Sequence, residues 1–470
     1  MRKFALLLVT ALAGCSLVPD LEKPALPTAQ NWPGAEAPGS QVAADIGWRS
    51  FFADPVTQAL IAEALASNRD LRIAALTAEA AEAQYRSSHA SLFPELDATA
   101  GFERSRTPGD VYGSSSSQNL RQYSAGLGVV SWELDFFGKL RSASQQARET
   151  WLQDKDLRES EQIAIVAQVA SAYDTWLADS AAHDIARETA EVEARTLQLT
   201  QAKLDHGSAT GIDVAQAEAS LRSAQASLAQ YARTVAQDMD SLVLLVGAPI
   251  SESTAKQMQD AAARRTLPPV PELAPGLPSD LLTRRPDIRA AEHALSGANA
   301  NIGAARAAFF PSVTLTANGG TAGEGMSRLF GAGQGAWLFE PQLSVPIFDE
   351  GRNQAALDLA KTQTRIEVAT YEKTIQSAFR DVADALAARR TYADQLAAQQ
   401  ALVAADQRYY KLAQMRFSAG ADNFLNVLVS QDSLLSARLN QVSLQLAAAQ
   451  NGVTLYKALG GGWTEADAHP

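Results

Sequence analysis

Cysteine is almost absent from this chain of 470 residues, since Cys15 is the only one. A single cysteine excludes an intramolecular disulfide, so packing or contacts between subunits must hold the fold together. The five histidines are scattered, with no pair at the spacing of metal ligands on a helix. The sequence also lacks a Gly-x-Ser-x-Gly turn and a phosphate-binding Walker loop. These absences argue against an enzyme, and we expect no catalytic residue, cofactor or metal.

The chain also lacks a basic stripe and long apolar runs. Its 40 Lys and Arg residues are outnumbered by 52 Asp and Glu residues, which gives a net charge of −12. Nucleic acids bind clustered positive charge, so we expect no nucleic-acid partner. After residue 14, no apolar run approaches the roughly 20 residues that a transmembrane helix requires. Any part of the mature chain that enters a membrane must therefore do so as β-strands.

The N-terminus carries a secretion signature. A short positive region precedes an apolar run that ends in Leu-Ala-Gly-Cys at 12–15. This run is too short to span a bilayer and predicts a cleaved signal peptide over 1–14. Leu-Ala-Gly-Cys resembles the bacterial lipobox, which implies that Cys15 is acylated and anchors the protein in membrane lipid. Ser16 then implies sorting to the outer membrane. The alternative is an ordinary signal peptide that happens to contain a cysteine.

The rest of the chain consists of two similar halves. Gly138, Gly207 and Gly247 recur 213 residues later as Gly351, Gly420 and Gly460. A constant offset over three landmarks indicates a tandem repeat rather than chance similarity between alanine-rich helices. An earlier Phe-Pro pair at 93–94 recurs at 310–311, so the second copy is four residues shorter in between. That deletion falls in a predicted hairpin, where loops absorb changes of length.

Each copy has the predicted order helix, β-hairpin, long helix, tight turn and long helix. The predicted divisions are a lipid-anchored segment at 15–55, a first repeat at 56–247, an equatorial linker at 248–278, a second repeat at 279–460 and a tail at 461–470. In the first repeat we predict a helix at 56–92, a hairpin at 95–135 and long helices at 139–206 and 210–247. In the second we predict a helix at 279–309, a hairpin at 312–347 and long helices at 352–418 and 422–459.

Apolar and polar residues alternate in both hairpins. The apolar positions of the first are Leu96, Ala98, Ala100 and Phe102, with Tyr123, Ala125, Leu127 and Val129 on the return strand. Those of the second are Val313, Leu315 and Ala317, with Trp337, Phe339 and Leu343 on the return strand. A period of two predicts strands with one apolar and one polar face, as in membrane barrels.

The long helices have a different period. In 214–235, 371–396 and 435–456 the apolar residues are spaced by three and four in turn. This spacing indicates coiled-coil-like seams. The helix after Gly138 carries two such seams on different faces, so we expect it to have neighbours on both sides, as in the wall of a helical barrel.

Four strands are too few to close a barrel, and open strand edges are not tolerated in hydrocarbon. Cyclic assembly removes the edges. Two subunits would supply eight strands around an interior filled by side chains, whereas three would supply twelve strands around an aqueous lumen. The strands therefore favour a homotrimer over a dimer.

The run LPSDLLTRRPDIR at 277–289, which continues to 311, resembles the TolC-like outer-membrane efflux factors. GWRSFFADP at 47–55 and NRDLRIA at 68–74 are similar to the lipidated branch that serves resistance-nodulation-division pumps. The resemblance covers nearly the whole mature chain. It implies a trimer with a 12-stranded outer-membrane β-barrel and a 12-helix periplasmic α-barrel. It also implies passive export of small molecules, with an inner-membrane pump and a periplasmic adaptor as partners.

Other functions remain open at this point. One alternative is the exit duct of a type I protein secretion system. A periplasmic adaptor lipoprotein is less favoured, because it would carry one helical hairpin rather than two copies that each follow a strand pair. A purely structural coiled-coil lipoprotein would lack the alternating strands.

The two helix-to-helix turns begin at Gly207 and Gly420 and are expected to form the periplasmic tip. In the family, an aromatic residue and an arginine near the second turn help to lock a gate, and aspartates ring the lumen. Phe417 stands where the aromatic residue is expected, whereas Asp422 stands where the arginine would be.

The acidic positions also differ from the family pattern. Asn426 and Val429 occupy the expected acidic positions of the second repeat, while the first repeat keeps Asp213. Gly207, Asp213, Phe417, Gly420 and Asp422 are thus the candidate gate or tip residues. The alternative is that each of them serves only its turn.

Overall fold

The computed structural model describes residues 16–22, 24–25, 27–29, 31–32, 45–108, 116–271, 273–276 and 278–463. The predicted signal peptide, the predicted lipidation site Cys15 and most of the predicted tail lie outside these residues. Contacts divide the chain into two compact units. The first comprises residues 1–25, 77–155 and 290–372, and the second comprises 26–76, 156–289 and 373–470.

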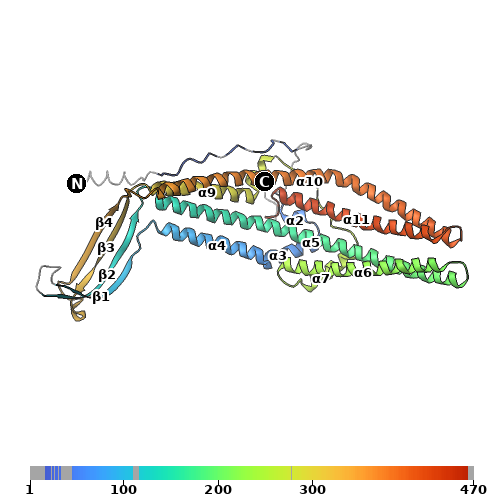
Figure 1. Ribbon diagram of the computed structural model, residues 1–470, viewed down its shortest axis with the longest axis horizontal. Helices are drawn as coiled ribbons and strands as arrows, with labels where there is room; N and C mark the ends of the chain where they lie inside the picture. Colours follow the sequence, from blue (N-terminus) through green and yellow to red (C-terminus); the bar gives the residue numbers. More distant parts are fainter. Residues whose placement is uncertain are drawn as a thin grey trace. The chain divides into compact units, whose positions relative to one another are not determined.

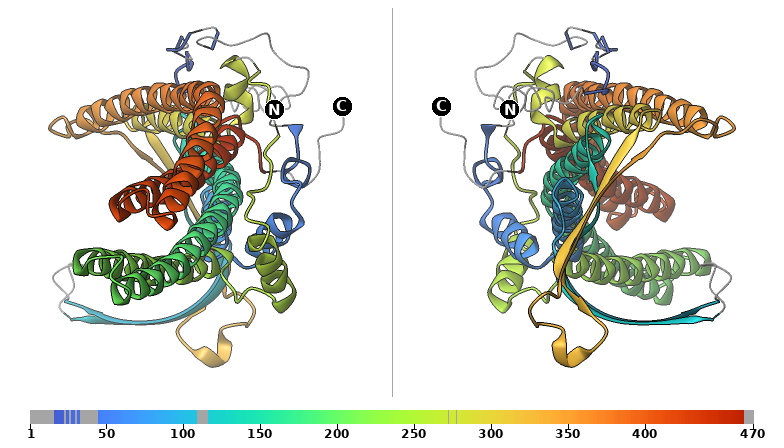
Figure 2. Two further views of the ribbon diagram at one scale, coloured as in Figure 1. Left: turned by 90° about the vertical axis from the view of Figure 1, so that its right-hand side faces the viewer. Right: turned by 90° about the vertical axis from the view of Figure 1, so that its left-hand side faces the viewer.

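The first unit contains one four-stranded antiparallel sheet in the order β1-β2-β3-β4 (Figure 1). Its strands are β1 (Asp97–Thr107), β2 (Gln118–Leu134), β3 (Ser312–Gly323) and β4 (Gly335–Ser344). Each repeat contributes one hairpin, and β2 pairs with β3 to join the two. The sheet is twisted, so that β1 and β2 run in a clearly different direction from β3 and β4 (Figure 2).

The predicted apolar positions of the strands lie opposite one another in the register. Ala98 pairs with Leu127 and Phe102 with Tyr123, whose rings are 4.7 Å apart. In the other hairpin, Leu343 pairs with Val313. The same face continues across the repeat boundary, because the remaining pairs in register include Leu127–Gly319, Trp132–Leu315 and Leu134–Val313. Since paired residues share a face, the alternation produces one continuous apolar face.

Glycines bring β2 and β3 close together. A Cβ atom built on Gly320 would lie 2.1 Å from the carbonyl oxygen of Ala125 and 2.5 Å from Cα of Gly126. Gly319, the preceding residue on β3, has open space where its Cβ would be. A register shift between Val129 and Trp132 places a bulge in β2, which increases the local twist.

The helices reproduce the repeat closely. The long helices α5 (Lys139–Asp205) and α10 (Arg352–Ser418) each contain 67 residues. The preceding helices α4 (Arg69–Ala90) and α9 (Pro286–Ala307) each contain 22 residues. The returning helices are α6 (Gly211–Val246) and α11 (Phe424–Ala458). In the second unit, α5 with α6 and α10 with α11 form two antiparallel helical hairpins (Figure 1).

The single helices predicted at 56–92 and 279–309 are each two helices in the structure. The first consists of α3 (Pro55–Ser67) and α4, separated by Asn68. The Asn68 side chain accepts a hydrogen bond from the Leu71 N–H at 2.8 Å and donates one to the Leu245 carbonyl at 2.7 Å, which stabilises the break. The second consists of α8 (Leu281–Arg284) and α9, separated by Arg285. Arg285 is extended because it precedes Pro286.

The core of the second unit includes short elements outside the long helices. Helix α2 (Trp48–Phe51) places Phe51 against Tyr456 of α11, with the rings stacked at 3.8 Å. The segment predicted as the equatorial linker contains α7 (Glu252–Ala262). Its Met258 is fully buried, and its Thr254 hydroxyl donates to Glu63 of α3 at 2.9 Å. The linker is therefore part of the packed core.

The two seams predicted on the helix after Gly138 are both buried in the second unit. Ile163, Val166, Ala170 and Tyr173 of one seam are buried, as are Ile165, Val169 and Trp176 of the other. Gln450 of α11 donates to the Thr175 hydroxyl on this helix at 3.0 Å. Helix α5 is thus packed along two sides, as its sequence pattern indicates.

A short extended segment of the first unit lies along α9. The carbonyl oxygen of Leu17 accepts a hydrogen bond from Arg306 at 3.0 Å, and that of Pro19 accepts one from Asn299 at 2.8 Å. Gly303 leaves the space between them open, since a Cβ there would lie 2.5 Å from Cγ2 of Val18. The chain directly after Cys15 is therefore held in place on a helix.

No helix within the described ranges has both the length and the apolar character that crossing a membrane requires.

Candidate functional site

The two helix-to-helix turns of the second unit share one backbone geometry. Gly207 and Gly420 have φ angles of 73° and 70°. The residue after each glycine donates to the carbonyl five residues earlier, at 2.7 Å for Ser208 and 2.9 Å for Ala421. Each glycine itself donates to the carbonyl three residues earlier. This pair of bonds is a Schellman motif, which needs a left-handed residue and so places glycine at each helix end.

Asp213 is engaged at the start of α6. Its carboxylate accepts hydrogen bonds from the backbone N–H and the hydroxyl of Thr210, both at 2.7 Å. The Asp213 N–H in turn donates to the Thr210 hydroxyl at 3.3 Å. This reciprocal arrangement is a capping box, which satisfies two backbone donors at the helix start.

Asp422 is engaged in the second turn. It accepts hydrogen bonds from the Asn423 N–H at 2.9 Å, the Asn426 amide at 2.8 Å and the Arg416 guanidinium at 3.2 Å. The Asn423 N–H, followed by the Asn426 and Arg416 side chains, holds the pKa of Asp422 below its ordinary value. The carboxylate therefore stays ionised, and all three of these bonds lie within its own helical hairpin.

Lys203 links the two hairpins. From the last turn of α5 its ammonium group donates to the Phe417 carbonyl of α10 at 3.1 Å. The same nitrogen lies 3.8 Å from the centre of the Phe417 ring. An ammonium group over an aromatic face is attracted by the negative face of the ring. Lys203 is thus a polar contact between the hairpins at the level of their turns.

An apolar cluster next to this contact contains residues from all four long helices. Its buried members are Ala217, Ala413, Phe424 and Val427, and the partly buried Leu197, Tyr410, Phe417 and Leu428 pack against them. The rings of Phe417 and Phe424 are 5.2 Å apart. Phe417, a candidate from the sequence, therefore joins the polar contact to the apolar cluster.

A buried acid lies farther along the same helices. Glu193 of α5 is only 3% exposed, and its Oε2 atom has no hydrogen-bond partner among the described residues. Burial, followed by the charge of Asp432, raises the pKa of Glu193 to about 7. Asp174 on the same helix behaves similarly, because burial and then the charge of Asp54 raise its pKa to about 7. Both carboxyls can thus exchange a proton near neutral pH.

The structure brings some of the predicted residues together and adds others. Gly207 and Asp213 lie in one turn, and Phe417, Gly420 and Asp422 lie in or beside the other. Sequence reasoning missed Lys203 and Glu193. The sequence does carry a signal for Lys203, because the 213-residue offset makes it equivalent to Arg416, the cation beside the second turn. No local sequence feature indicates that Glu193 is buried, since its burial depends on α10 and α11.

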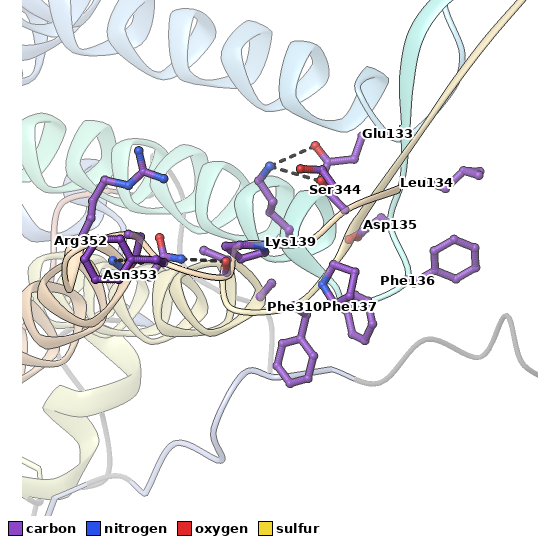
Figure 3. Close-up of a pocket in the computed structure, with 17 residues that line it drawn as sticks. Glu133, Leu134, Asp135, Phe136, Phe137, Lys139, Phe310, Ser344, Arg352 and Asn353 are labelled. Atoms are coloured by element: carbon purple, nitrogen blue, oxygen red, sulfur yellow. Dashed lines mark hydrogen bonds and ion pairs between the residues drawn. The ribbon is translucent and has the colours of Figure 1, made fainter. Parts of the chain in front are cut away.

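A separate cavity of about 400 Å³ lies in the first unit, where the sheet meets the helices (Figure 3). Several of its polar groups are already paired. Lys139 forms an ion pair with Glu133 at 3.0 Å, and the Asn353 amide donates to the Ala308 carbonyl at 3.1 Å. Phe137 stacks on Phe310 with ring centres 4.7 Å apart. These contacts indicate that the cavity belongs to the structural junction between the sheet and the helices of the first unit.

No group of three His, Cys, Asp or Glu side chains is placed to hold a metal ion in the part of the chain that the structure covers. The features with functional potential are the open sheet of the first unit and the paired turns of the second.

The family model "Outer membrane efflux protein" matches residues 60–248 and 277–461. The toluene efflux pump outer membrane protein TtgC of Pseudomonas putida is 47% identical over 98% of this chain and 95% of its own length. The antibiotic efflux pump outer membrane protein ArpC of Pseudomonas putida has the same identity and coverage. The open-state crystal structure of the MtrE outer membrane channel of Neisseria gonorrhoeae superposes with a TM-score of 0.85 at 35% identity, over 97% of this chain and all of that one.

The chain therefore belongs to the outer membrane efflux protein family. The family and the fold class expected from the sequence are confirmed. The two matched segments overlap the predicted repeats 56–247 and 279–460.

Proposed function

We propose that this protein is the outer-membrane channel subunit of a tripartite efflux system driven by a resistance-nodulation-division pump. Three copies form a passive duct, and a periplasmic adaptor connects the duct to the inner-membrane pump. The observation that carries the proposal is the sheet, whose two edge strands have no partner within the described chain. The repeated pair of long helical hairpins supports it, because equal helices make a tunnel of even length.

The open strand edges favour cyclic assembly. Three copies of a four-stranded sheet supply twelve strands, and pairing β4 of one copy with β1 of the next leaves no edge unpaired. The antiparallel order is preserved around such a ring. The start of β1 and the end of β4 lie at the same end of the sheet, so they meet at each junction between copies.

Large apolar side chains stand exposed at these two strand ends. Beside β1, Phe93 and Leu96 are 62% and 68% exposed. Beside β4, Ile347 and Phe348 are 96% and 87% exposed. Exposed apolar area costs roughly 25 cal/mol per Å² relative to burial, so covering it favours assembly. We infer that a neighbouring copy covers these residues.

A cysteine pair tests this assembly. With Leu96→Cys and Val345→Cys in one chain, oxidation should link neighbouring copies, and a non-reducing gel of outer membranes should show a ladder that ends at the trimer. Leu96→Cys with Met326→Cys is the matched control. Met326 is exposed in the loop at the other end of β4, so this pair should stay monomeric on the gel. Equal cross-linking of both pairs, or a ladder that stops at the dimer, would contradict the proposal.

We propose that the turns form the periplasmic gate, with Gly207, Asp213, Phe417, Gly420 and Asp422 as tip residues. Asp213 and Asp422 are the acidic candidates. We expect Asp213→Ala and Asp422→Ala each to alter the block by divalent cations or the resting conductance of the reconstituted channel, because each removes a negative charge near the opening. Unchanged single-channel currents in both variants would leave the two aspartates with a role in their turns alone.

We also propose that acylated Cys15 anchors each subunit in the outer membrane. The contacts of Leu17, Val18 and Pro19 with α9 would hold such an anchor at one position. The cargo is small molecules, and the inner-membrane pump selects them, since relatives of equal similarity carry names that refer to toluene and to antibiotics. The duct itself has no catalytic role.

A further inference from the structure

We propose that Glu193 is a proton-sensitive latch that holds the two helical hairpins of one subunit together at acidic pH and releases them at alkaline pH. The inference rests on the proposed function, because it describes how the gate of the duct is regulated. Glu193 lies on α5, in the first hairpin, and interacts electrostatically with Tyr410 of α10 and Asp432 of α11 in the second.

The first support is the burial of a carboxyl that has an unpartnered oxygen. The Oε2 atom of Glu193 and the Oε1 atom of Gln431 are both buried and without hydrogen-bond partners among the described residues. Gln431 is 6% exposed and directly precedes Asp432, whose charge acts on Glu193. Burial penalises the ionised form of a carboxyl whose lost solvation no hydrogen bond offsets. A protonated Glu193 can donate a hydrogen bond, whereas an ionised Glu193 cannot.

The second support is the position of a cavity. A cavity of about 400 Å³ lies between α5, α10 and α11, and Val192 and Gln431 are among its lining residues. Water that enters here can reach the contact between the hairpins. The buried carboxyl is therefore close to solvent from which it can exchange a proton.

Among the described ion pairs, no cation on the packed helices is directed to Glu193. On α6, Arg222 is directed to Glu218 at 3.4 Å. From α11, Arg438 is directed to Glu188 at 3.7 Å, and Asp432 adds negative charge. From α10, Tyr410 and the exposed Lys411 line the cavity. On α5 itself, Glu188 is already bound by Arg265 at 2.7 Å. Arg195 acts on Tyr410, whose pKa is raised by burial and then by the charge of Glu193.

The direction of the pH effect follows from the pKa of Glu193. Burial and Asp432 raise it from an ordinary value of 4.5 to about 7 in the closed contact. The closed contact therefore holds a proton that a solvated Glu193 would release. The stabilisation that the protonated Glu193 gives to the closed contact is fully present below about pH 4.5. It is lost as the pH rises from about 4.5 to about 7, and it is smallest above about pH 7. One group changes an equilibrium at most tenfold per pH unit, so the closed-to-open ratio of a subunit falls by at most roughly 300-fold.

Planar-bilayer recordings of the full-length, lipidated trimer test the latch. Between roughly pH 5 and pH 8, the conductance of the native channel should rise as the contact opens. Glu193→Gln keeps the shape and hydrogen-bonding capacity of the protonated acid, so its conductance should stay low across this range. Glu191→Gln is the matched control, because Glu191 is an exposed glutamate two residues away. It should show the native pH response.

A second variant keeps the test independent of any folding defect in Glu193→Gln. Gln431→Lys supplies the missing cation, which stabilises ionised Glu193 and should also remove the pH response. Hydrogen exchange of the segment 424–440, corrected for intrinsic rates, should increase with pH in the native trimer and not in either latch variant. A native pH response in Glu193→Gln, or none in the native channel, would overturn the latch. Failure of the native protein to form conducting trimers would instead overturn the proposed function.

Discussion

Replacing Phe417 with alanine should increase leakage through the proposed gate. The substitution removes the ring beneath the Lys203 ammonium group, 3.8 Å away, and the ring contact with Phe424 at 5.2 Å. It also removes apolar packing against the cluster at the helix turns. Loss of a partly buried aromatic ring together with its cation contact costs roughly 2 kcal/mol. That corresponds to a shift on the order of thirtyfold toward the open state in each subunit.

Two measurements check this effect. The macroscopic conductance of reconstituted trimers should rise at least roughly tenfold, as the shift toward the open state predicts. Cells that carry Phe417→Ala should also become sensitive to large antibiotics that the outer membrane normally excludes. Tyr409→Ala is a suitable control, because Tyr409 is an exposed aromatic residue on the same helix.

Lys203→Met separates the charge from the packing. Methionine keeps an apolar stem but loses both the hydrogen bond to the Phe417 carbonyl and the cation over the ring. We expect a smaller increase in conductance than for Phe417→Ala. Native conductance in Phe417→Ala would show that other contacts keep the turns together.

Replacing Gly320 with valine should abolish the assembled channel. A Cβ there would lie 2.1 Å from the Ala125 carbonyl oxygen, which is backbone and has no room to move within the paired strands. The contact joins β2 to β3, the only pairing that connects the two repeats within the described sheet. Forcing the strands apart costs roughly 3 kcal/mol or more in each subunit. We expect the heat-modifiable trimer to fall at least roughly tenfold in outer-membrane fractions.

Gly319→Val is the matched control for this variant. Gly319 is the neighbouring residue of the same strand, and a Cβ atom added to it would meet nothing within 4 Å. Valine favours extended strands, so this variant should assemble normally. If both variants assembled equally well, the close approach of β2 and β3 would not limit folding.

The periodicities of the sequence predict much of the fold. The 213-residue offset between glycines predicts long helices of equal length, and α5 and α10 indeed span 67 residues each. The alternating strands predict one apolar face, and pairs such as Phe102–Tyr123 and Leu343–Val313 lie on it. These features depend on local spacing along the chain, so a single sequence can reveal them.

The break at Arg285 has a local cause, because the residue before a proline is disfavoured in a helix. The break at Asn68 shows where local spacing is insufficient, since its segment continues the helical pattern in sequence. Asn68 nevertheless ends one helix and begins another, because its side chain bonds both to Leu71 and to the distant Leu245 carbonyl. Helix α7 shows the same dependence, since burial of Met258 requires neighbours from elsewhere in the chain.

The candidate gate likewise has features that the sequence predicts and contacts that depend on packing. The two turns and their glycines can be predicted from the sequence, because ending a helix with a left-handed residue is a local requirement. The contacts of the side chains there cannot be predicted in this way. Lys203 and Arg416 are equivalent by repeat, yet Lys203 reaches Phe417 of the other hairpin, whereas Arg416 binds Asp422 in its own. Contacts between hairpins depend on how the helices pack against one another, and the same packing buries Glu193.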